Sequence, residues 1–262
     1  MLDGGFELLR HRFAPLMALT ACLFVPVWLL HLTLAIVAPP ELDGNLLSGQ
    51  FWSPLSSGSS SPLAVVASGL QLVALSMLGL CVGHMAAALA RGEETTLAEL
   101  GSLALRRFWV AALIVPLTSA VHLVTACLGG VGWVLGDAVV FLTSVAAGAE
   151  RLGPWRAFQR SWQLTRPSFG RALVISFGGL CISLVIRLSL SFGPAALALS
   201  LDPTSPLVGF LGAASTAVLL VTEPLTACIA ARAYLDLRCR REGWDLAMRQ
   251  DLLEATAVRT AT

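Results

Sequence analysis

The sequence predicts an all-α integral membrane protein, with six transmembrane helices in three hairpins and a short amphipathic interfacial helix before each hairpin on the cytoplasmic side. Three observations predict this class. Hydrophobic residues make up 56% of the 262 residues, charged residues only 13%, and the mean hydropathy is +0.79, which is unusual for a soluble domain. Six apolar runs approach or exceed the roughly 20 residues that cross a hydrocarbon core of about 30 Å. Apart from Arg187, arginine is confined to the two terminal segments and to alternate connections between these runs.

The expected spans follow one another along the chain. They are residues 13–37, 63–90, 108–128, 131–149, 173–199 and 206–231, with a tail at 232–262. What remains between them is too short for a separate soluble domain of ordinary size. We therefore expect one polytopic membrane domain over residues 1–262. The first run is longer than the apolar region of a signal peptide, and we interpret it as a retained span.

The arginines predict the orientation. Of the 17 basic residues, all arginine, 16 lie at the N-terminus, in the connections 91–107 and 150–171, or in the C-terminal segment, and only Arg187 lies within a span. The connections 38–62, 129–130 and 200–205 contain no arginine. By the positive-inside rule both termini are then cytoplasmic. Arginine-only usage with abundant Ala, Leu and Gly is typical of a bacterial genome of high G+C content, so we expect a multi-pass protein of the bacterial plasma (inner) membrane.

Three basic amphipathic segments precede the three expected hairpins. They read "FELLRHRF" (6–13), "LAELGSLALRRF" (97–108) and "WRAFQRSW" (155–162). In the third, the spacing i, i+3, i+7 places the aromatic side chains on one helical face and the arginines away from it. Such a helix is expected to lie at the inner headgroup boundary, in contact with anionic lipid headgroups. The predicted lipid-contact residues are Trp155, Arg156, Phe158, Arg160 and Trp162.

The three expected hairpins also end alike. The segments "AAALARGEE" (86–94), "AAGAERLG" (146–153) and "AARAYLDLRCRREG" (230–243) each run from an Ala-rich helix end to arginine and then glycine. One interpretation is a threefold internal repeat. The alternative is that basic flanks are common wherever membrane helices enter the cytoplasm.

Two segments carry a resemblance to a known family. The stretches "ERLGPWRAFQRSWQLTRPSFGRALVISF" (150–177) and "EPLTACIAARAYLDLRCRREGWDLAMR" (223–249) are similar to the membrane domain fused to some bacterial glycerophosphoryl diester phosphodiesterases, and to stand-alone relatives of that domain. The resemblance implies a membrane domain without chemistry of its own, because hydrolysis in the fused proteins belongs to a soluble metal-dependent barrel. These 262 residues leave no room for such a barrel, so phosphodiesterase activity is not expected.

Ionisable residues inside spans are expensive and are candidates for function. We single out four as a candidate buried polar site, and they are His122, Asp137, Arg187 and Glu223. Counting along the spans predicts similar depths for Asp137 and Arg187, and hence an ion pair that serves a polar gate, a headgroup site or structure alone. Glu223 precedes Pro224, where a carboxylate at a kink binds a cation or a proton, or stays neutral and hydrogen-bonded.

Several function classes find no support in the sequence. It contains no metal-ligand spacing, nucleotide-binding glycine pattern or nucleophile motif. A formal net charge of +1, with arginines at membrane flanks, argues against nucleic-acid binding. We expect a non-enzymatic membrane accessory or scaffold protein without a cofactor or metal, with the lipid bilayer and a further membrane protein as candidate partners. The alternatives are a transporter or lipid-handling protein that uses the buried ionisable residues, and an intramembrane enzyme.

Overall fold

The computed structural model describes residues 9–10, 12–37, 62–199 and 217–243, and it is all-helical there, with no strand among them. The helices are α2 (Phe13–Val37), α4 (Pro62–Ala90), α5 (Leu97–Arg106), α6 (Phe108–Ala126), α7 (Gly129–Val140), α8 (Thr143–Ala149), α9 (Pro154–Thr165), the 3-10 turn η1 (Arg166–Ser168), α10 (Phe169–Leu199) and α12 (Leu219–Glu242).

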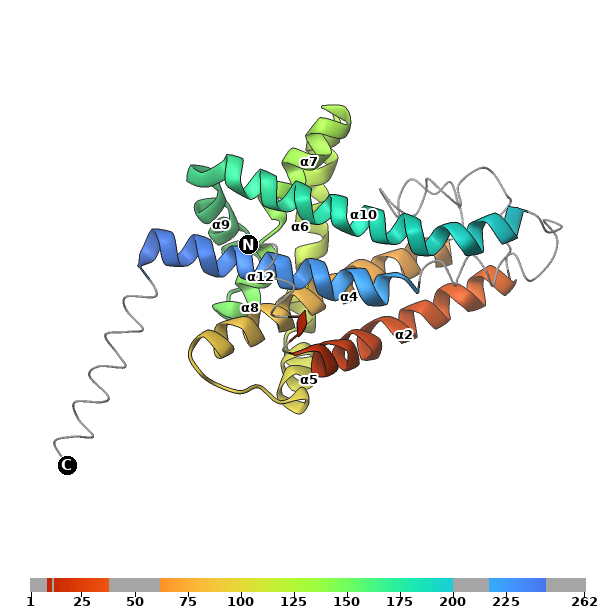
Figure 1. Ribbon diagram of the computed structural model, residues 1–262, viewed down its shortest axis with the longest axis horizontal. Coiled ribbons are helices and arrows are strands. Elements are labelled where there is room, and N and C mark those ends of the chain that lie inside the picture. The colour runs from red at the N-terminus through yellow and green to blue at the C-terminus, as the bar shows by residue number, and fades with distance from the viewer. Residues whose placement is uncertain (1–8, 11, 38–61, 200–216, 244–262) are drawn as a thin grey trace.

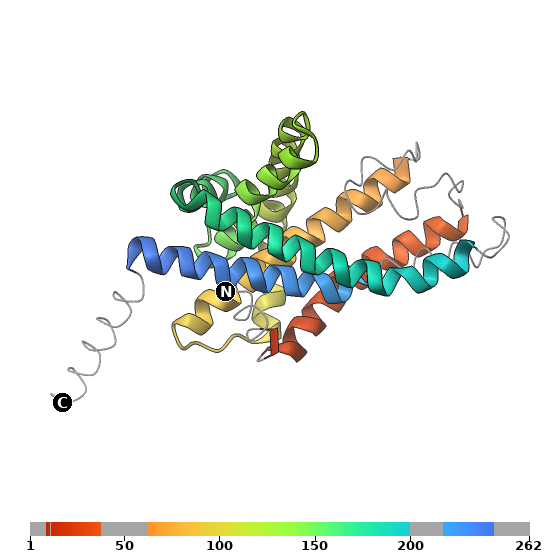
Figure 2. The same ribbon diagram turned by 45° about the horizontal axis from the view of Figure 1, so that its top comes forward.

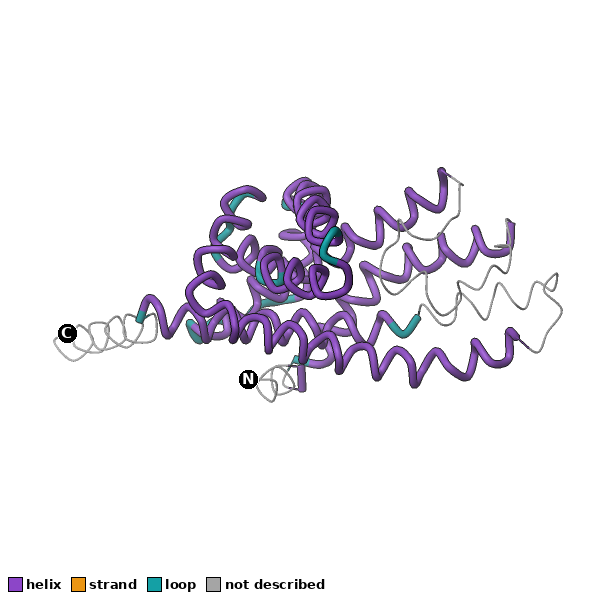
Figure 3. The backbone as a smooth tube through the Cα atoms, turned by 90° about the horizontal axis from the view of Figure 1, so that it is seen from above, coloured by secondary structure: helices purple, strands orange, loops and turns teal. Residues whose placement is uncertain are grey.

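Four long helices define the main direction of the fold. Helices α2, α4, α10 and α12 run along the long axis, and α8 and α9 gather where α4 and α12 end and α10 begins (Figure 1). Helices α6 and α7 form a hairpin that stands across this axis, as the yellow-green pair in Figure 2 also shows. Short loops join the helices of the described residues (Figure 3). The three expected hairpins are therefore not three equivalent parallel pairs.

Helix α4 is the centre of the bundle, because it contacts α2, α6, α8 and α12. Its second half is almost fully buried, with Leu78, Cys81 and Val82 at 1% exposure or less. The helix achieves this with small side chains, of which Ala86–Ala88 are the last buried group. Small residues let helix backbones approach each other, which is the usual basis of helix packing in membranes.

The contact between α4 and α8 is a contact of backbones. A Cβ atom added at Gly148 would lie 1.8 Å from the carbonyl oxygen of Leu80, and one added at Gly83 would lie 2.3 Å from that of Val145. Neither neighbour can move aside, since both are backbone atoms. Glycine is therefore required at both positions for α8 to reach α4.

Five of the described helical segments are long and apolar enough to cross a membrane, which indicates a multi-pass membrane protein. They are Phe13–Thr33, Val66–Ala90, Phe108–Ala126, Gly129–Ala149 and Pro154–Leu190. The sixth expected span begins at residue 206, outside the described residues. Its described part, α12, continues as one helix to Glu242, well past the expected end at residue 231.

The fourth expected span, 131–149, is not one helix. It is divided into α7 and α8 by a turn at Phe141 and Leu142. In a continuous helix the carbonyl of Val139 would accept a hydrogen bond from the amide of Thr143, but here it accepts one from the hydroxyl of Ser161 at 2.8 Å. The polar group from α9 thus satisfies a backbone carbonyl at the break.

The second and third amphipathic segments are helices, but they differ in what covers them. In α5, Leu100 and Ala104 are buried, so most of its apolar face packs on the bundle and not on lipid. In α9, Trp155 and Trp162 are exposed by 58% and 41%. Of the first segment, residues 6–8 and 11 lie outside the described residues. An interfacial position thus stays a prediction, and α9 has the exposure that it requires.

Candidate functional site

Polar side chains gather where α8, α9 and α12 meet. We define the α9 network as Glu150, Arg160, Tyr234, Arg238 and Glu242. Arg160 donates from Nε to both carboxylate oxygens of Glu150, at 2.9 and 3.1 Å, and from Nη2 to the carboxylate of Glu242. The Arg238 Nε donates to Glu242 at 3.0 Å and lies 3.7 Å from Glu150. Two guanidinium groups and two carboxylates thus balance one another.

Tyr234 anchors the network from within the bundle. Its side chain is 1% exposed, and its hydroxyl donates to the carboxylate of Glu150. Burial raises the pKa of Tyr234 above its ordinary value, and the hydrogen bond to Glu150 raises it further. Both effects favour the neutral phenol over the phenolate. Tyr234 therefore remains a hydrogen-bond donor at any physiological pH.

Local sequence explains how the network is positioned. Gly153 caps α9 in an extended conformation and Pro154 occupies its first turn, where a missing amide hydrogen costs nothing. Arg160 then lies about two turns into α9, above Glu150 at the end of α8. On α12, Tyr234, Arg238 and Glu242 are spaced by four residues and so share one face. The two halves of the network come from residues 150–177 and 223–249.

The predicted lipid-contact residues divide into two groups. Trp155, Arg156 and Trp162 are exposed, and Phe158 is half-buried with its ring 5.9 Å from that of Trp155. Arg160 differs from the prediction, because its guanidinium turns inward to Glu150 and Glu242 and not outward to lipid phosphates. The face of a helix predicts the direction in which a side chain leaves the backbone. The long arginine side chain then places its guanidinium group beside the nearest carboxylates. Both glutamates stand in the quoted segments and are the signal that could have identified the network.

The predicted Asp137–Arg187 pair is wrong. Arg187 binds the carboxylate of Glu223 through Nη2, and its Nε donates to Thr222 at 3.3 Å. Asp137 instead accepts a hydrogen bond from Ser176 at 2.6 Å. Along α10, Ser176 and Arg187 are separated by about 16 Å at 1.5 Å per residue, so Asp137 and Arg187 lie at different depths.

Two errors of counting explain that mistake. A last span that ends at residue 231 places Glu223 about 12–13 Å from the cytoplasmic end, whereas α12 continues to Glu242 and leaves Glu223 about 28 Å from that end. The prediction also treated the α6–α7 hairpin as parallel to the other spans, whereas it stands across them (Figure 1). Counting residues along α6 or α7 therefore does not give the position of a side chain along the long axis of the bundle.

The remaining predicted residue, His122, lies beside Asp137. Its Nε2 is 4.0 Å from the Oδ1 of Asp137, and its ring stacks on Trp133 with centroids 4.5 Å apart. His122, Asp137 and Ser176 come from α6, α7 and α10. The four candidate residues thus form two separate polar pairs, His122–Asp137 and Arg187–Glu223, and not one site.

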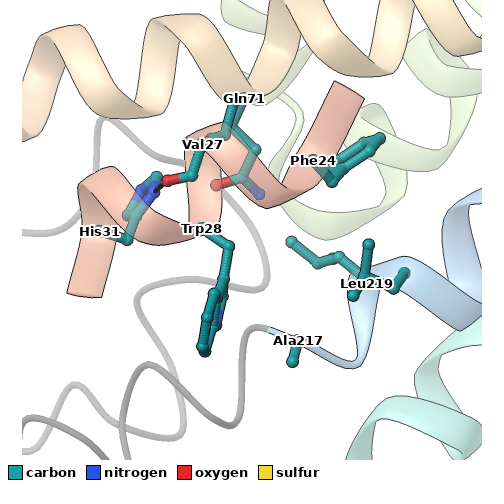
Figure 4. Close-up of a pocket in the computed structure, with 8 residues that line it drawn as sticks. Phe24, Val27, Trp28, His31, Gln71, Ala217 and Leu219 are labelled. Atoms are coloured by element: carbon teal, nitrogen blue, oxygen red, sulfur yellow. Dashed lines mark hydrogen bonds between the residues drawn. The ribbon is translucent and has the colours of Figure 1, made fainter. Parts of the chain in front are cut away.

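A small pocket lies at the other end of the long helices. Figure 4 shows Phe24, Trp28 and His31 of α2 around it, with Gln71 of α4 and Leu219 near the start of α12. The His31 Nδ1 donates back to the carbonyl of Val27 at 2.9 Å, and most of the lining is apolar. Among the described residues, no group of three or more His, Cys, Asp or Glu is arranged to hold a metal ion.

No protein-family model, no curated protein and no solved structure matches the chain.

Proposed function

We propose that the protein is a non-enzymatic accessory or scaffold protein of the bacterial plasma membrane, and a stand-alone relative of the membrane domain fused to glycerophosphoryl diester phosphodiesterases. In this proposal both termini are cytoplasmic and α9 lies at the cytoplasmic headgroup boundary. The α9 network carries the proposal, because it fixes α9 to α8 and α12 while the outer face of α9 stays exposed.

The exposed face of α9 has the composition of an interfacial surface. Trp155 and Trp162 supply large amphipathic rings, which favour the headgroup level of a bilayer. Arg156 of α9 and Arg166 of the adjoining turn η1 are exposed and form no ion pair with a carboxylate among the described residues. A basic residue near an anionic leaflet contributes about 1 kcal/mol to binding. The surface therefore suits anionic headgroups, held in a fixed geometry that a partner membrane protein can recognise.

Lipid counting by native mass spectrometry tests this function. Protein released from nanodiscs of mixed neutral and anionic phospholipid should carry bound anionic lipid. The double variant Arg156→Gln with Arg166→Gln should carry fewer bound anionic lipids. Arg240→Gln is the matched control, because Arg240 is exposed but already paired with Asp236 at 2.9 Å. Equal anionic lipid binding in the double variant and the wild type would remove the headgroup surface from the proposal.

A second candidate function is that of a transporter or lipid-handling protein. The observation that favours it is the Arg187–Glu223 pair, in which Glu223 is 5% exposed. Charged pairs inside membrane bundles mark pathways for ions and protons in many transport proteins. A buried pair also serves to fix helix positions, so this function needs a test of transport itself.

A further inference from the structure

The buried face of α10 carries small and polar side chains. Its buried positions include Ala172, Ser176, Gly179 and Ser183, which the spacing of three and four residues places on one face. Arg187 continues that face one turn further. The opposite face exposes Val174, Phe177 and Val185, each at 50% or more. We name the line formed by the buried Ser176, Gly179 and Ser183 and the half-buried Arg187 the α10 stripe.

A carboxylate lies at each end of the α10 stripe. The hydroxyl of Ser176 donates to Asp137 at 2.6 Å, and Arg187 binds Glu223. His122 extends the first end, and Thr226, which donates to Glu223 at 3.4 Å, extends the second. Chains of carboxylates, imidazoles and hydroxyls within membranes are the groups from which proton relays are made.

Two polar atoms along this line are buried without a protein partner. Among the described residues, neither the Oγ of Ser183 nor the Nε2 of His122 has a hydrogen-bond partner. Ser183 is only 4% exposed, and an unsatisfied hydroxyl in an apolar interior costs free energy. The buried hydroxyl of Ser183 has a partner if a water molecule or another proton carrier passes along the stripe.

One apolar contact interrupts the line. At Gly179 the methyl group Cγ2 of Ile229 lies 3.7 Å, and its Cδ1 3.9 Å, from the position that a Cβ atom would take. Ile229 is 2% exposed and belongs to α12. Ile229 therefore packs against the α10 stripe at Gly179, between Ser176 and Ser183. At that position the stripe has no polar side chain. Hydrophobic constrictions close pores by excluding water.

We propose that the α10 stripe is a gated proton route between Asp137 and Glu223, closed by Ile229 in this structure. When Ile229 moves aside, water enters beside Gly179 and joins the two ends. Asp137 takes up a proton at one end, each hydroxyl or water accepts one proton and donates another, and Glu223 releases a proton at the other end. Arg187 stays protonated throughout, so each transfer moves one positive charge from Asp137 to Glu223.

This inference deepens the transporter function and does not rest on the lipid-binding surface of α9. Failure of the proton route would leave the anionic lipid count unchanged, and loss of lipid binding in the Arg156 and Arg166 variant would leave the proton route intact. The two proposals are therefore separable by experiment.

Proton flux into vesicles tests the route. Full-length protein is reconstituted in vesicles, a potassium gradient with valinomycin sets the membrane potential, and a pH-sensitive dye reports internal acidification. Ile229→Ala should raise the proton flux about tenfold or more over the wild type, because the constriction widens. Ile229→Val should give an intermediate flux, and it removes only one methylene group, so it remains informative should the alanine variant fail to fold. Val185→Ala, on the exposed face of the same helix, should match the wild type.

Dependence on the two carboxylates distinguishes a route from a leak. In the Ile229→Ala background, Asp137→Asn or Glu223→Gln should return the proton flux to that of protein-free vesicles. Gly179→Ala in that background should also lower the flux, because a methyl group refills part of the space. An Ile229→Ala flux equal to that of Val185→Ala, or a raised flux that persists with both carboxylates neutralised, would overturn the proposal.

Discussion

Tyr234 donates its phenolic hydrogen bond to Glu150, a residue 84 positions earlier in the chain. The bond joins the end of the fourth apolar segment to α12, and Arg160 of α9 binds the same carboxylate. Three elements thus share one acidic group, and the position of α9 depends on it.

Tyr234 is the only tyrosine of the chain, so the absorbance of phenolate near 295 nm reports its ionisation alone. Because burial and the bond to Glu150 raise the pKa of Tyr234, the folded protein should form little phenolate at pH 10, where a free tyrosine is about half ionised. Unfolding in denaturant should restore ordinary titration. The raised pKa stabilises the fold below about pH 10, and this contribution is lost as pH rises through the folded value.

Glu150→Gln should bring the Tyr234 titration part of the way back, because the charge of the acceptor is lost while burial remains. Asp236→Asn is the control, since Asp236 lies on α12 but binds Arg240 instead. An unchanged titration in Glu150→Gln would mean that the bond to Glu150 does not form in the membrane.

Arg160→Gln should lower the free energy of unfolding by about 2–3 kcal/mol, because it leaves Glu150 and Glu242 close together with Arg238 as the one cation that the network retains between them. Arg156→Gln, on the same helix but exposed, should change it by less than about 0.5 kcal/mol. Thermal or denaturant unfolding in detergent measures both values. Similar losses for the two variants would show that the α9 network does not hold α9 in place.

Arg187 and Glu223 should be energetically coupled. Arg187→Gln and Glu223→Gln each leave one buried charge unpaired, and the double variant should recover part of the loss, with a coupling of about 1–3 kcal/mol in a double-mutant cycle. The matched cycle replaces Glu223→Gln by Asp137→Asn, and its losses should add. Additive losses for Arg187 and Glu223, together with coupling between Arg187 and Asp137, would support the Asp137–Arg187 pair instead.

Gly148→Ala should destabilise the fold by more than about 2 kcal/mol, because its Cβ would collide with the Leu80 carbonyl. Gly101→Ala is the control, since nothing lies within 4 Å of a Cβ at that position in α5, and alanine favours a helix there by up to about 1 kcal/mol. A tolerated Gly148→Ala would show that α4 and α8 are further apart in the bilayer.

The proposed orientation predicts which side of the membrane each connection faces. In a variant without cysteines, Ser57→Cys and Ser205→Cys should react with an impermeant thiol reagent in intact cells. Thr95→Cys and Gln163→Cys should react only after the membrane is opened. Labelling at residue 163 from outside would mean that the orientation is the reverse of the proposed one, or that the number of spans is wrong.

The sequence was sufficient for the helical class and for most helix bounds, because long apolar runs permit few other structures in lipid. The expected span 63–90 and the helix Pro62–Ala90 agree to within one residue. The break at Phe141 and Leu142 was not predictable from hydropathy, since α7 and α8 are both apolar. It depends on Ser161, whose contact with Val139 exists only in the folded chain.

Side-chain pairing was harder to predict than helix position. Arg187 and Glu223 were both selected as candidates, but their pairing depends on where α12 ends, which the mixed composition of residues 232–242 conceals. The sequence predicts a lipid contact for Arg160 because the helical periodicity of residues 155–162 describes that helix alone. Its actual partners come from α8 and α12, and a single sequence without contacts gives no way to bring those residues together.

The backbone contact between α4 and α8 also constrains the order of assembly. Gly83 leaves the ribosome 65 residues before Gly148, so α4 is made before the backbone of α8 that packs against it. A chain that ends before residue 143 contains α4 without α8. Such fragments should be degraded faster than fragments that end after residue 150, which pulse-chase labelling of the two truncations would measure.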